Sequence, residues 1–357
     1  MATTIPDQEA VETFAGRLIE LYGGGMLTYL IDIGHRTGLF DAAAAGGTSQ
    51  EIAERAGLHE RYVREWLGAM ATGRIVEYDP ATATYRLPET HAACLTGPGG
   101  MNLAPISQLN THLAQHVGEV ATAFREGGGV PYAAFRPEFT DIMDGLGRGA
   151  YDQFLVDAIL PLVPGLTERL TAGARVADVA CGTGHALVVL AGAFPASTFT
   201  GYDLDEGAIE RARAEAAGAG LRNLTFEVAD APKLHVPEPL DAAFVFDALH
   251  DQVDPAGVLD RIHEALAPGG VFVMKEPRVS SNLEDNIGNP MAPLVYSVST
   301  LHCLTVSLAY GGAGLGTAFG EQVARRLLDG AGFADVAVHE APGDPMDAVY
   351  VSYKSAG

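Results

Sequence analysis

A glycine-rich turn followed by an acid carries the clearest chemical signal in the chain. The apolar run VADVA at residues 176–180 predicts a strand that is covered on both faces, and CGTG at residues 181–184 turns the backbone directly after it. ALVVLAGAF then predicts a helix, and STFTGYD predicts a second strand that ends on Asp203. Ligands of open α/β sheets bind at the carboxyl ends of the strands, where the Asp203 carboxylate can accept two hydrogen bonds from a ribose diol.

Two details of this turn discriminate between classes of nucleotide. A dinucleotide site prefers G-x-G-x-x-G, but Leu187 stands where the third glycine belongs. A P-loop needs G-K-[ST], and no lysine follows this turn. A turn that serves only packing is the alternative interpretation. The pattern therefore favours an adenosyl group without a pyrophosphate.

His250 is the residue best suited to proton transfer. It lies in DALHDQVDP, just past the apolar strand pattern LDAAFVF and therefore at the same carboxyl edge. A histidine with a pKa near 6.5 is largely neutral at cellular pH and can accept a proton. Asp251 is a second catalytic candidate, or else it caps the helix that begins near Asp254. Glu276 ends a later strand near the same cleft, or pairs with a neighbouring basic residue. A loop histidine that only packs or contacts a cofactor is the alternative for His250.

The other histidines are weaker candidates. His112 and His116 lie four residues apart on a predicted helix and can share one face, as metal ligands do. The sequence places no third ligand beside them, so we predict no metal site. These two histidines line the substrate cleft or are solvated. Tyr296 and His302 lie in a later apolar segment and are further substrate candidates, although a packed histidine is the alternative for His302.

The spacing of DVACGTGH and GYDLD resembles the first two motifs of class I S-adenosylmethionine-dependent methyltransferases. The resemblance continues through EVADAP and LDRIHEALAPGGVFVMKEP, and it covers roughly residues 166–278. Ala180 stands where many members carry glycine. Leu249-His250-Asp251 is similar to the L-H-D-W segment of O-methyltransferases, with Gln252 in place of tryptophan. In those enzymes the histidine deprotonates the acceptor hydroxyl, which implies the same role for His250.

The resemblance also implies a cofactor, S-adenosylmethionine, with S-adenosylhomocysteine as the product. It implies close main-chain approach at Gly182, ribose binding by Asp203, contact of Asp230 with the adenine amino group, and a cradle for the methionine portion at Phe246-Asp247. The full set of implied cofactor-binding residues is Asp178, Gly182, Gly184, Asp203, Leu204, Asp230, Ala231, Phe246, Asp247 and Tyr151.

The N-terminal part of the chain predicts a winged helix. Residues 10–42 predict two apolar helices that are interrupted by the glycines at 23–25. Thr48 and Glu51 form a capping-box pattern at the start of the next helix, and HERYVREWLGAMATGR predicts another helix before a short hairpin. Over about residues 25–95 this module resembles the dimerisation domain of small-molecule O-methyltransferases, which implies a homodimer.

We therefore expect three segments. Residues 1–95 form a helical and winged-helix domain, residues 96–165 form a helical connector along the substrate cleft, and residues 166–357 form the S-adenosylmethionine-binding domain with a lid-like insert at 279–318. The expected fold class is α/β: a Rossmann-like class I methyltransferase sheet, mostly parallel with an antiparallel last strand. The whole chain also resembles actinobacterial and mycobacterial winged-helix methyltransferases that carry this insert.

Composition restricts the partners. The net charge is −23, with 22 basic against 45 acidic residues, which disfavours a nucleic-acid partner because such partners bind through Lys and Arg. The three cysteines are too few for a disulfide framework, the N-terminal residues do not resemble a secretory signal, and no stretch of about 18 consecutive apolar residues predicts a membrane span. We expect a cytoplasmic protein.

The leading hypothesis is a methyltransferase that acts on an oxygen of a small, fairly apolar molecule. Transfer to nitrogen or carbon stays open, as does a cyclase or rearrangement enzyme of the same fold. A winged-helix regulator that senses S-adenosylmethionine is the non-enzymatic alternative, and duplex binding at low salt would reveal it.

Overall fold

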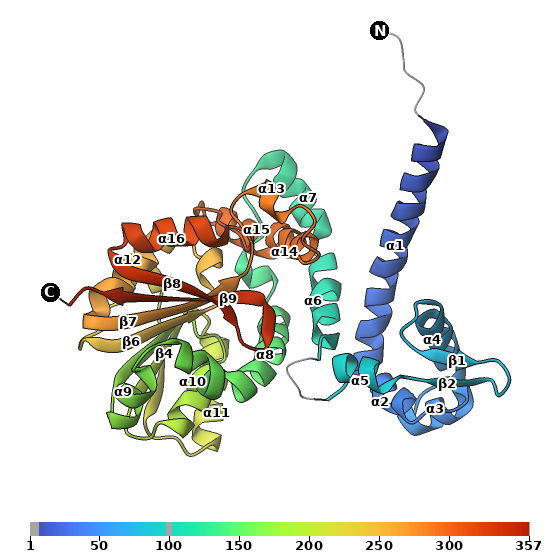
Figure 1. The fold of residues 1–357 in the computed structure, drawn as a ribbon, viewed down its shortest axis with the longest axis horizontal. Coiled ribbons are helices and arrows are strands. Elements are labelled where there is room, and N and C mark those ends of the chain that lie inside the picture. The colour runs from blue at the N-terminus through green and yellow to red at the C-terminus, as the bar shows by residue number, and fades with distance from the viewer. Residues whose placement is uncertain (1–6, 98–101, 357) are drawn as a thin grey trace, which may run out of the picture. The chain divides into compact units, whose positions relative to one another are not determined.

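The protein divides into two compact units, Met1–Thr111 and His112–Gly357, in a computed structural model that describes residues 7–97 and 102–356. The first unit carries helices and a two-stranded hairpin, and the second is built around a seven-stranded sheet (Figure 1). The expected fold class is thereby confirmed. The boundaries of the three expected segments stay predictions.

The first unit is a winged helix, as the sequence predicts. Thr48 caps its third helix in a complete capping box with Glu51, and Gly57 ends that helix in the left-handed conformation. Phe40 and Trp66 pack edge to face in its core. Its elements are α1 (Gln8–Arg36), α2 (Leu39–Ala44), α3 (Ser49–Ala56), α4 (Glu60–Thr72), β1 (Glu77–Asp79), β2 (Thr84–Arg86) and α5 (Glu89–Leu95).

The expected break at glycines 23–25 is wrong, because α1 runs unbroken for 29 residues. A glycine costs a helix about 1 kcal/mol relative to alanine but keeps its N–H and C=O groups, so the hydrogen-bond ladder continues through the triplet. Large apolar side chains on α1 stay exposed, among them Phe14 at 63%, Ile19 at 70% and Tyr22 at 65%.

The sheet of the second unit has the strand order β5-β4-β3-β6-β7-β9-β8. Its first five strands in this order are parallel, and β9 runs antiparallel between β7 and β8. The expected antiparallel last strand is confirmed. The strands are β3 (Arg175–Val179), β4 (Thr198–Asp203), β5 (Leu224–Val228), β6 (Leu240–Phe246), β7 (Leu266–Pro277), β8 (Phe333–Ala341) and β9 (Asp344–Lys354).

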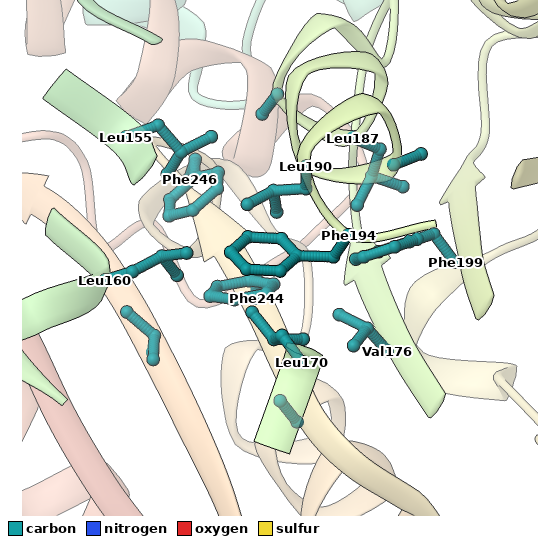
Figure 2. Close-up of a cluster of buried hydrophobic side chains, with 14 of the residues drawn as sticks. Leu155, Leu160, Leu170, Val176, Leu187, Leu190, Phe194, Phe199, Phe244 and Phe246 are labelled. Carbon is teal, nitrogen blue, oxygen red and sulfur yellow. The ribbon is translucent and has the colours of Figure 1, made fainter. Parts of the chain in front are cut away.

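Helices cover both faces of this sheet. Side chains alternate along β6, so Phe244 and Phe246 face one core while Ala243 and Val245 face the other. Figure 2 shows the first core, where Phe244 lies among leucines and phenylalanines of the helices and strands around it. The helices on the sheet are α9 (Leu166–Ala172), α10 (His185–Ala193), α11 (Glu206–Gly218), α12 (Pro255–Ala265) and α16 (Gly320–Gly330).

Two further helical segments complete the second unit, one before the sheet and one after β7. They contact each other where the Val130 N–H donates to Thr305 Oγ1 over 2.9 Å. The first begins with the end of α6 (Ala104–Ala114), a helix that runs across the boundary between the two units, and continues with α7 (Val117–Glu126), η1 (Tyr132–Ala134), α8 (Glu138–Ala150), η2 (Tyr151–Ile159) and η3 (Leu160–Leu162). The second comprises α13 (Leu283–Asn286), α14 (Ala292–Val298), η6 (Ser299–Cys303) and α15 (Leu304–Ala309).

One helix of the described residues, Ala292–Ala309, is long and apolar enough by composition to cross a membrane. Of that stretch, 44% is buried inside the protein. The core helix of a soluble protein meets the same two criteria, so this helix is weak support for a membrane span.

Candidate active site

The turn after β3 is built from left-handed backbone. Ala180, Gly182 and Gly184 have φ values of 61°, 54° and 75°. The Gly182 N–H donates to Asp203 Oδ2 over 2.8 Å, and the Asp205 N–H donates to Asp203 Oδ1 over 2.8 Å. The acid at the end of β4 is therefore fixed by two main-chain groups. Burial raises the pKa of Asp203, although these two N–H groups act in the opposite direction.

The two predicted cofactor glycines differ in their surroundings. A Cβ atom added at Gly182 meets nothing within 4 Å, whereas one added at Gly184 falls 2.3 Å from the Phe226 ring. Gly182 thus leaves space beside the main chain, while Gly184 lets α10 pack closely against β5. The sequence pattern alone does not separate these two uses of glycine.

Asp178 lies on β3 beneath the turn and is buried. Its Oδ1 atom has no hydrogen-bond partner among the described residues. Burial, and then the nearby Asp203 carboxylate, raises the pKa of Asp178 well above its ordinary value. An unpaired buried acceptor is costly, so this atom is suited to a donor from a ligand.

The remaining predicted cofactor residues follow β4, β5 and β6 or open η2. Leu204 is exposed directly after Asp203, and Asp230 pairs with Lys233 over 2.7 Å at the start of η4 (Ala231–Lys233). Asp247 adopts a φ of 55° after β6. The Phe246 ring lies 5.6 Å from the Tyr151 ring, measured between centroids. The structure therefore brings most of these residues to one edge of the sheet.

His250 lies in η5 (Leu249–Asp251) and is held by Glu276 on β7. The His250 Nδ1–H donates to Glu276 Oε2 over 2.5 Å, and the Leu249 N–H donates to Glu276 Oε1 over 2.8 Å. His250 is 3% exposed and Glu276 is fully buried. Because an ionised carboxylate only accepts hydrogen bonds, this contact places a proton on Nδ1, so the lone pair of the neutral ring is on Nε2.

The alternative that Glu276 pairs with a neighbouring basic residue is wrong. Side chains alternate along a strand, so Lys275 points to the other face of β7 and pairs there with Asp347 over 2.6 Å and Asp344 over 2.8 Å. Arg278, beyond the strand, pairs with Glu340. Glu276 is left to His250, a partner that sequence neighbours do not reveal.

The charges around His250 set its proton affinity. Burial lowers the pKa of His250, but the carboxylates of Glu276 and Asp251 outweigh burial and raise it well above the ordinary value. Burial likewise raises the pKa of Glu276, against the attraction of His250. A base with a raised pKa binds a proton more strongly than an ordinary histidine.

The alternative role of Asp251 as a helix cap is wrong, because Asp254 caps α12 by accepting from the Gly257 N–H over 2.9 Å. Asp251 instead faces His250, with Oδ1 3.4 Å from Nε2. This Oδ1 atom is buried and finds no hydrogen-bond partner within the described ranges. Asp251 is therefore free to accept a hydrogen bond or ligand a cation.

His302 connects His250 and Asp251 to an aromatic cluster, which contains the rings of His302, Phe135 and Phe139. Its ring stacks on Phe139 at 3.6 Å between centroids and lies 4.6 Å from Phe135. Both ring nitrogens are fully buried without a hydrogen-bond partner in the described part of the chain. Burial lowers the pKa of His302 to about 4, so this ring is neutral.

The other substrate candidates divide into two groups. His112 and His116 join the aromatic cluster, with ring centroids 5.4 Å apart. His116 bonds Glu119, while burial, and then His116, lowers the pKa of His112. The Tyr296 hydroxyl instead accepts from Asn286 Nδ2 over 3.2 Å inside the insert.

The sequence predicts no individual site residue at 130–139, although this segment lies in the expected connector. It contacts both the end of β4, through Arg136, and the aromatic cluster, through Phe135 and Phe139. Arg136 pairs with Asp205 over 2.9 Å and lies over the Tyr132 ring. Burial, and the nearby carboxylates of Asp203 and Asp251, raise the pKa of Tyr132 to about 12. The segment has no periodic pattern or motif that marks it, so only the fold reveals its position.

Two family models match the chain. Residues 25–97 match the Rv2258c-like winged HTH domain, and residues 170–312 match a methyltransferase domain. No curated protein matches the chain significantly.

Solved structures share the fold over nearly the whole chain. An O-methyltransferase family protein from Burkholderia thailandensis is 18% identical with a TM-score of 0.68, covering 96% of this chain and 98% of its own. Mitomycin 7-O-methyltransferase MmcR is 17% identical with a TM-score of 0.69, covering 97% and 100%. Human N-acetylserotonin methyltransferase, solved with S-adenosylmethionine, is 20% identical with a TM-score of 0.63, covering 99% and 100%. At these identities the likeness establishes the fold.

Proposed function

We propose that this chain, a methyltransferase with an N-terminal winged helix-turn-helix domain, transfers the methyl group of S-adenosylmethionine to an oxygen atom of a small, fairly apolar molecule. S-adenosylhomocysteine is the second product. One observation carries the choice of oxygen: a buried histidine, His250, is oriented by Glu276 at the carboxyl edge of the sheet. Transfer to a hydroxyl needs a base, whereas transfer to a neutral amine needs less assistance.

The residues at the turn fit the cofactor. Gly182 leaves space beside its main chain, and Asp178 has a buried oxygen without a partner, suited to the amino group of the methionine portion. Asp203 holds the ribose hydroxyls, and Leu204, Asp230 and Ala231 surround the adenine. Phe246, Asp247 and Tyr151 line the methionine side, and Gly184 supports the turn through its packing. When bound, S-adenosylmethionine supplies an electrophilic methyl group on a good leaving group.

His250 performs the proton transfer. Glu276 keeps the proton on Nδ1 and orients the ring, so Nε2 accepts the proton of the acceptor hydroxyl as the oxygen forms its bond to carbon. Glu276 also stabilises the imidazolium that results, because the two groups then form a buried ion pair. Asp251, with Oδ1 3.4 Å from Nε2, lies where it can accept a hydrogen bond from the Nε2–H that results.

The aromatic cluster suits a flat, apolar acceptor. Phe135 and Phe139 offer ring faces, while the neutral rings of His112 and His302 offer one donor and one acceptor each. His116 and Tyr296 lie at the margin of this arrangement. We further propose that the insert at 279–318 closes over the acceptor and that residues 112–165, the part of the expected connector in the second unit, form the facing wall.

The first unit makes a homodimer in this proposal. The apolar side chains exposed on α1, such as Phe14, Ile19 and Tyr22, need a cover, and a second copy of the helix supplies it. Both arginines of α4 that face solvent, Arg61 and Arg64, pair with glutamates of the same helix, which leaves little charge for DNA. The free cysteines suit a reducing cytoplasm.

Transfer of a radiolabelled methyl group from S-adenosylmethionine tests the proposal. A panel of planar hydroxyl compounds, each paired with its amine analogue and its methyl ether, should give label in the hydroxyl members and none in the ethers. Calorimetry should detect S-adenosylhomocysteine binding to the same preparation. Failure of this ligand to bind would overturn the proposal, and label in the amines alone would overturn the assignment to oxygen.

A further inference from the structure

We propose that His250, Asp251 and Cys303 form a binding site for a zinc-class divalent cation. One ligand atom from each residue lies within 4.8 Å of the other two. Imidazole nitrogen, carboxylate oxygen and thiolate sulfur are the donors that zinc takes in proteins. The three residues come from η5 and η6, two segments that the fold brings together, so no local sequence motif predicts the site.

The spacing suits a tetrahedral ion. Zinc bonds of about 2.0–2.3 Å put neighbouring ligand atoms roughly 3.3–3.8 Å apart. His250 Nε2 and Asp251 Oδ1 are already 3.4 Å apart, and small side-chain rotations bring the third ligand in. The Thr317 hydroxyl donates a hydrogen bond to Cys303 Sγ over 2.7 Å, which fixes the sulfur in place.

His302 supplies a fourth ligand. Its Nδ1 lies 4.0 Å from Asp251 Oδ2. The ring is completely buried, and neither nitrogen has a hydrogen-bond partner among the residues that the structure describes. Such a nitrogen is costly to leave unpaired, and a metal bond satisfies it. The surrounding η6 is a π-helical turn, a distortion that often accompanies functional sites.

The groups outside the ligands also suit a cation. Metal-bound histidines usually donate their second ring N–H to a carboxylate, and His250 Nδ1 does so to Glu276. The second group of potential ligands, Asp247, His250 and Glu276, is less suitable because it requires that same Nδ1 atom, which carries the proton. Together, Glu276 and Asp251 place two carboxylates around one histidine in a buried region, and a divalent ion balances them.

Binding has a consequence for the proposed reaction, and this consequence rests on the proposed function. The Cys303 thiol releases its proton to solvent as sulfur binds the ion. The ion occupies the Nε2 lone pair of His250, so that lone pair no longer accepts the proton of the acceptor. The metal-loaded protein is therefore inactive, and the cation is an inhibitor that competes with the acceptor.

Cobalt titration of the full-length protein under anaerobic conditions tests the site directly. Cobalt bound by a thiolate gives a sulfur-to-metal charge-transfer band in the near ultraviolet, and the chain has only three cysteines. Wild-type protein should develop this band with one cobalt per chain, and zinc should remove it. Cys303→Ser should abolish the band. Cys94→Ser, in the first unit, is the matched control and should keep it.

If the Cys303→Ser variant does not fold, X-ray absorption spectroscopy of the wild-type zinc complex can identify the atoms bound to the metal instead. One sulfur and two or three nitrogen or oxygen neighbours support the site, and an ion bound only by oxygen overturns it. Absence of the cobalt band, or a band that survives Cys303→Ser, also overturns it.

A methyl-transfer assay tests the consequence separately. Zinc should inhibit wild type, and Cys303→Ser should need about 10–100-fold more zinc for the same inhibition, the loss typical even of an outer metal partner. Equal inhibition of both proteins would overturn the inhibitory role. If no methyl transfer is found at all, the proposed function fails while the cobalt band still decides the metal site.

Discussion

The turn after β3, which we propose binds the cofactor and call the cofactor turn, lies at the same edge of the sheet as His250, Asp251 and His302, which we propose face the acceptor and call the acceptor cluster. The two are built in opposite ways. The turn combines two consecutive strands, and its acid, Asp203, is held by the N–H groups of Gly182 and Asp205. The cluster of His250, Asp251 and His302 comes from η5 and η6, and its support comes from Glu276 on β7. One site is organised by main chain and the other by side chains.

This difference determines which site tolerates change. Main-chain donors stay in place when side chains vary, so the turn depends on few residues. In the acceptor cluster each buried polar atom relies on a single partner or on none, as Asp251 Oδ1 and the His302 ring show within the described residues. Buried groups with few partners favour specificity at a cost in stability. Substitutions should therefore separate binding of the cofactor from turnover of the acceptor.

The largest effect should follow from His250→Ala. Removal of the base should lower kcat for a hydroxyl acceptor by about 10²–10⁴-fold, since that is the usual contribution of a positioned base. Binding of S-adenosylhomocysteine, measured by calorimetry, should be unchanged. An amine acceptor should lose much less rate. If kcat for the hydroxyl fell less than tenfold, His250 would be only a packing residue and the comparison between the two sites would collapse.

Asp203→Ala should give the next largest effect, now on the cofactor side. Loss of charged hydrogen bonds to the ribose costs about 1.5–3 kcal/mol, which corresponds to a roughly 10–150-fold rise in Kd for S-adenosylhomocysteine. The KM for the acceptor should be the same in Asp203→Ala as in the wild type. Circular dichroism must confirm that the turn still folds, because Asp203 also accepts from the Gly182 N–H. Unchanged cofactor affinity in a folded variant would remove Asp203 from the site.

The contrast between the two sites also explains what the sequence reveals. The turn was predictable because its glycines and acid follow two consecutive strands in a fixed spacing. His250 could be placed for the same reason, directly after β6. Glu276 could be placed near the same cleft, but its pairing with His250 could not be predicted. The side-chain alternation of β7 and the pairing of β6 with β7 decide which residue faces the histidine.

The structure departs from the sequence predictions in two places, for two different reasons. Propensity predicted a break at glycines 23–25, but a continuous hydrogen-bond ladder outweighs a modest loss per residue in α1. The stacking of Phe139 on His302 joins the helical segment before β3 to the helical segment after β7, and no periodicity in the sequence predicts such a contact. Patterns in a single sequence do not predict contacts between segments that are far apart along the chain.

Glu276→Gln should sharpen the account of the acceptor side through the pH dependence of kcat. In the proposed reaction His250 acts when it is neutral, and its pKa is raised in the native protein because Glu276 and Asp251, together with Cys303, outweigh burial. Activity of the wild type should therefore rise only at a pH above the ordinary value for histidine. Without the Glu276 charge, burial has more weight, so the acid limb should move to lower pH while maximal kcat falls less than in His250→Ala. A limb that stays in place would assign the titration to another group.

The smallest effect, on the free energy of unfolding, comes from comparing Gly182→Ala with Gly184→Ala. Both residues have left-handed backbone, so alanine costs each about 1–2 kcal/mol of strain. Only at Gly184 does the new methyl group meet the Phe226 ring at 2.3 Å, which adds about 1–3 kcal/mol of overpacking.

Urea denaturation should therefore rank Gly184→Ala as the less stable variant. Calorimetry should show the reverse order for affinity, with the larger loss of S-adenosylhomocysteine binding in Gly182→Ala. The methyl group introduced there fills the space beside the main chain that we propose the cofactor needs. The shared backbone strain cancels between the two variants, so the difference isolates packing from ligand approach. Equal stability together with equal affinity would mean that the turn makes no distinction between its two glycines.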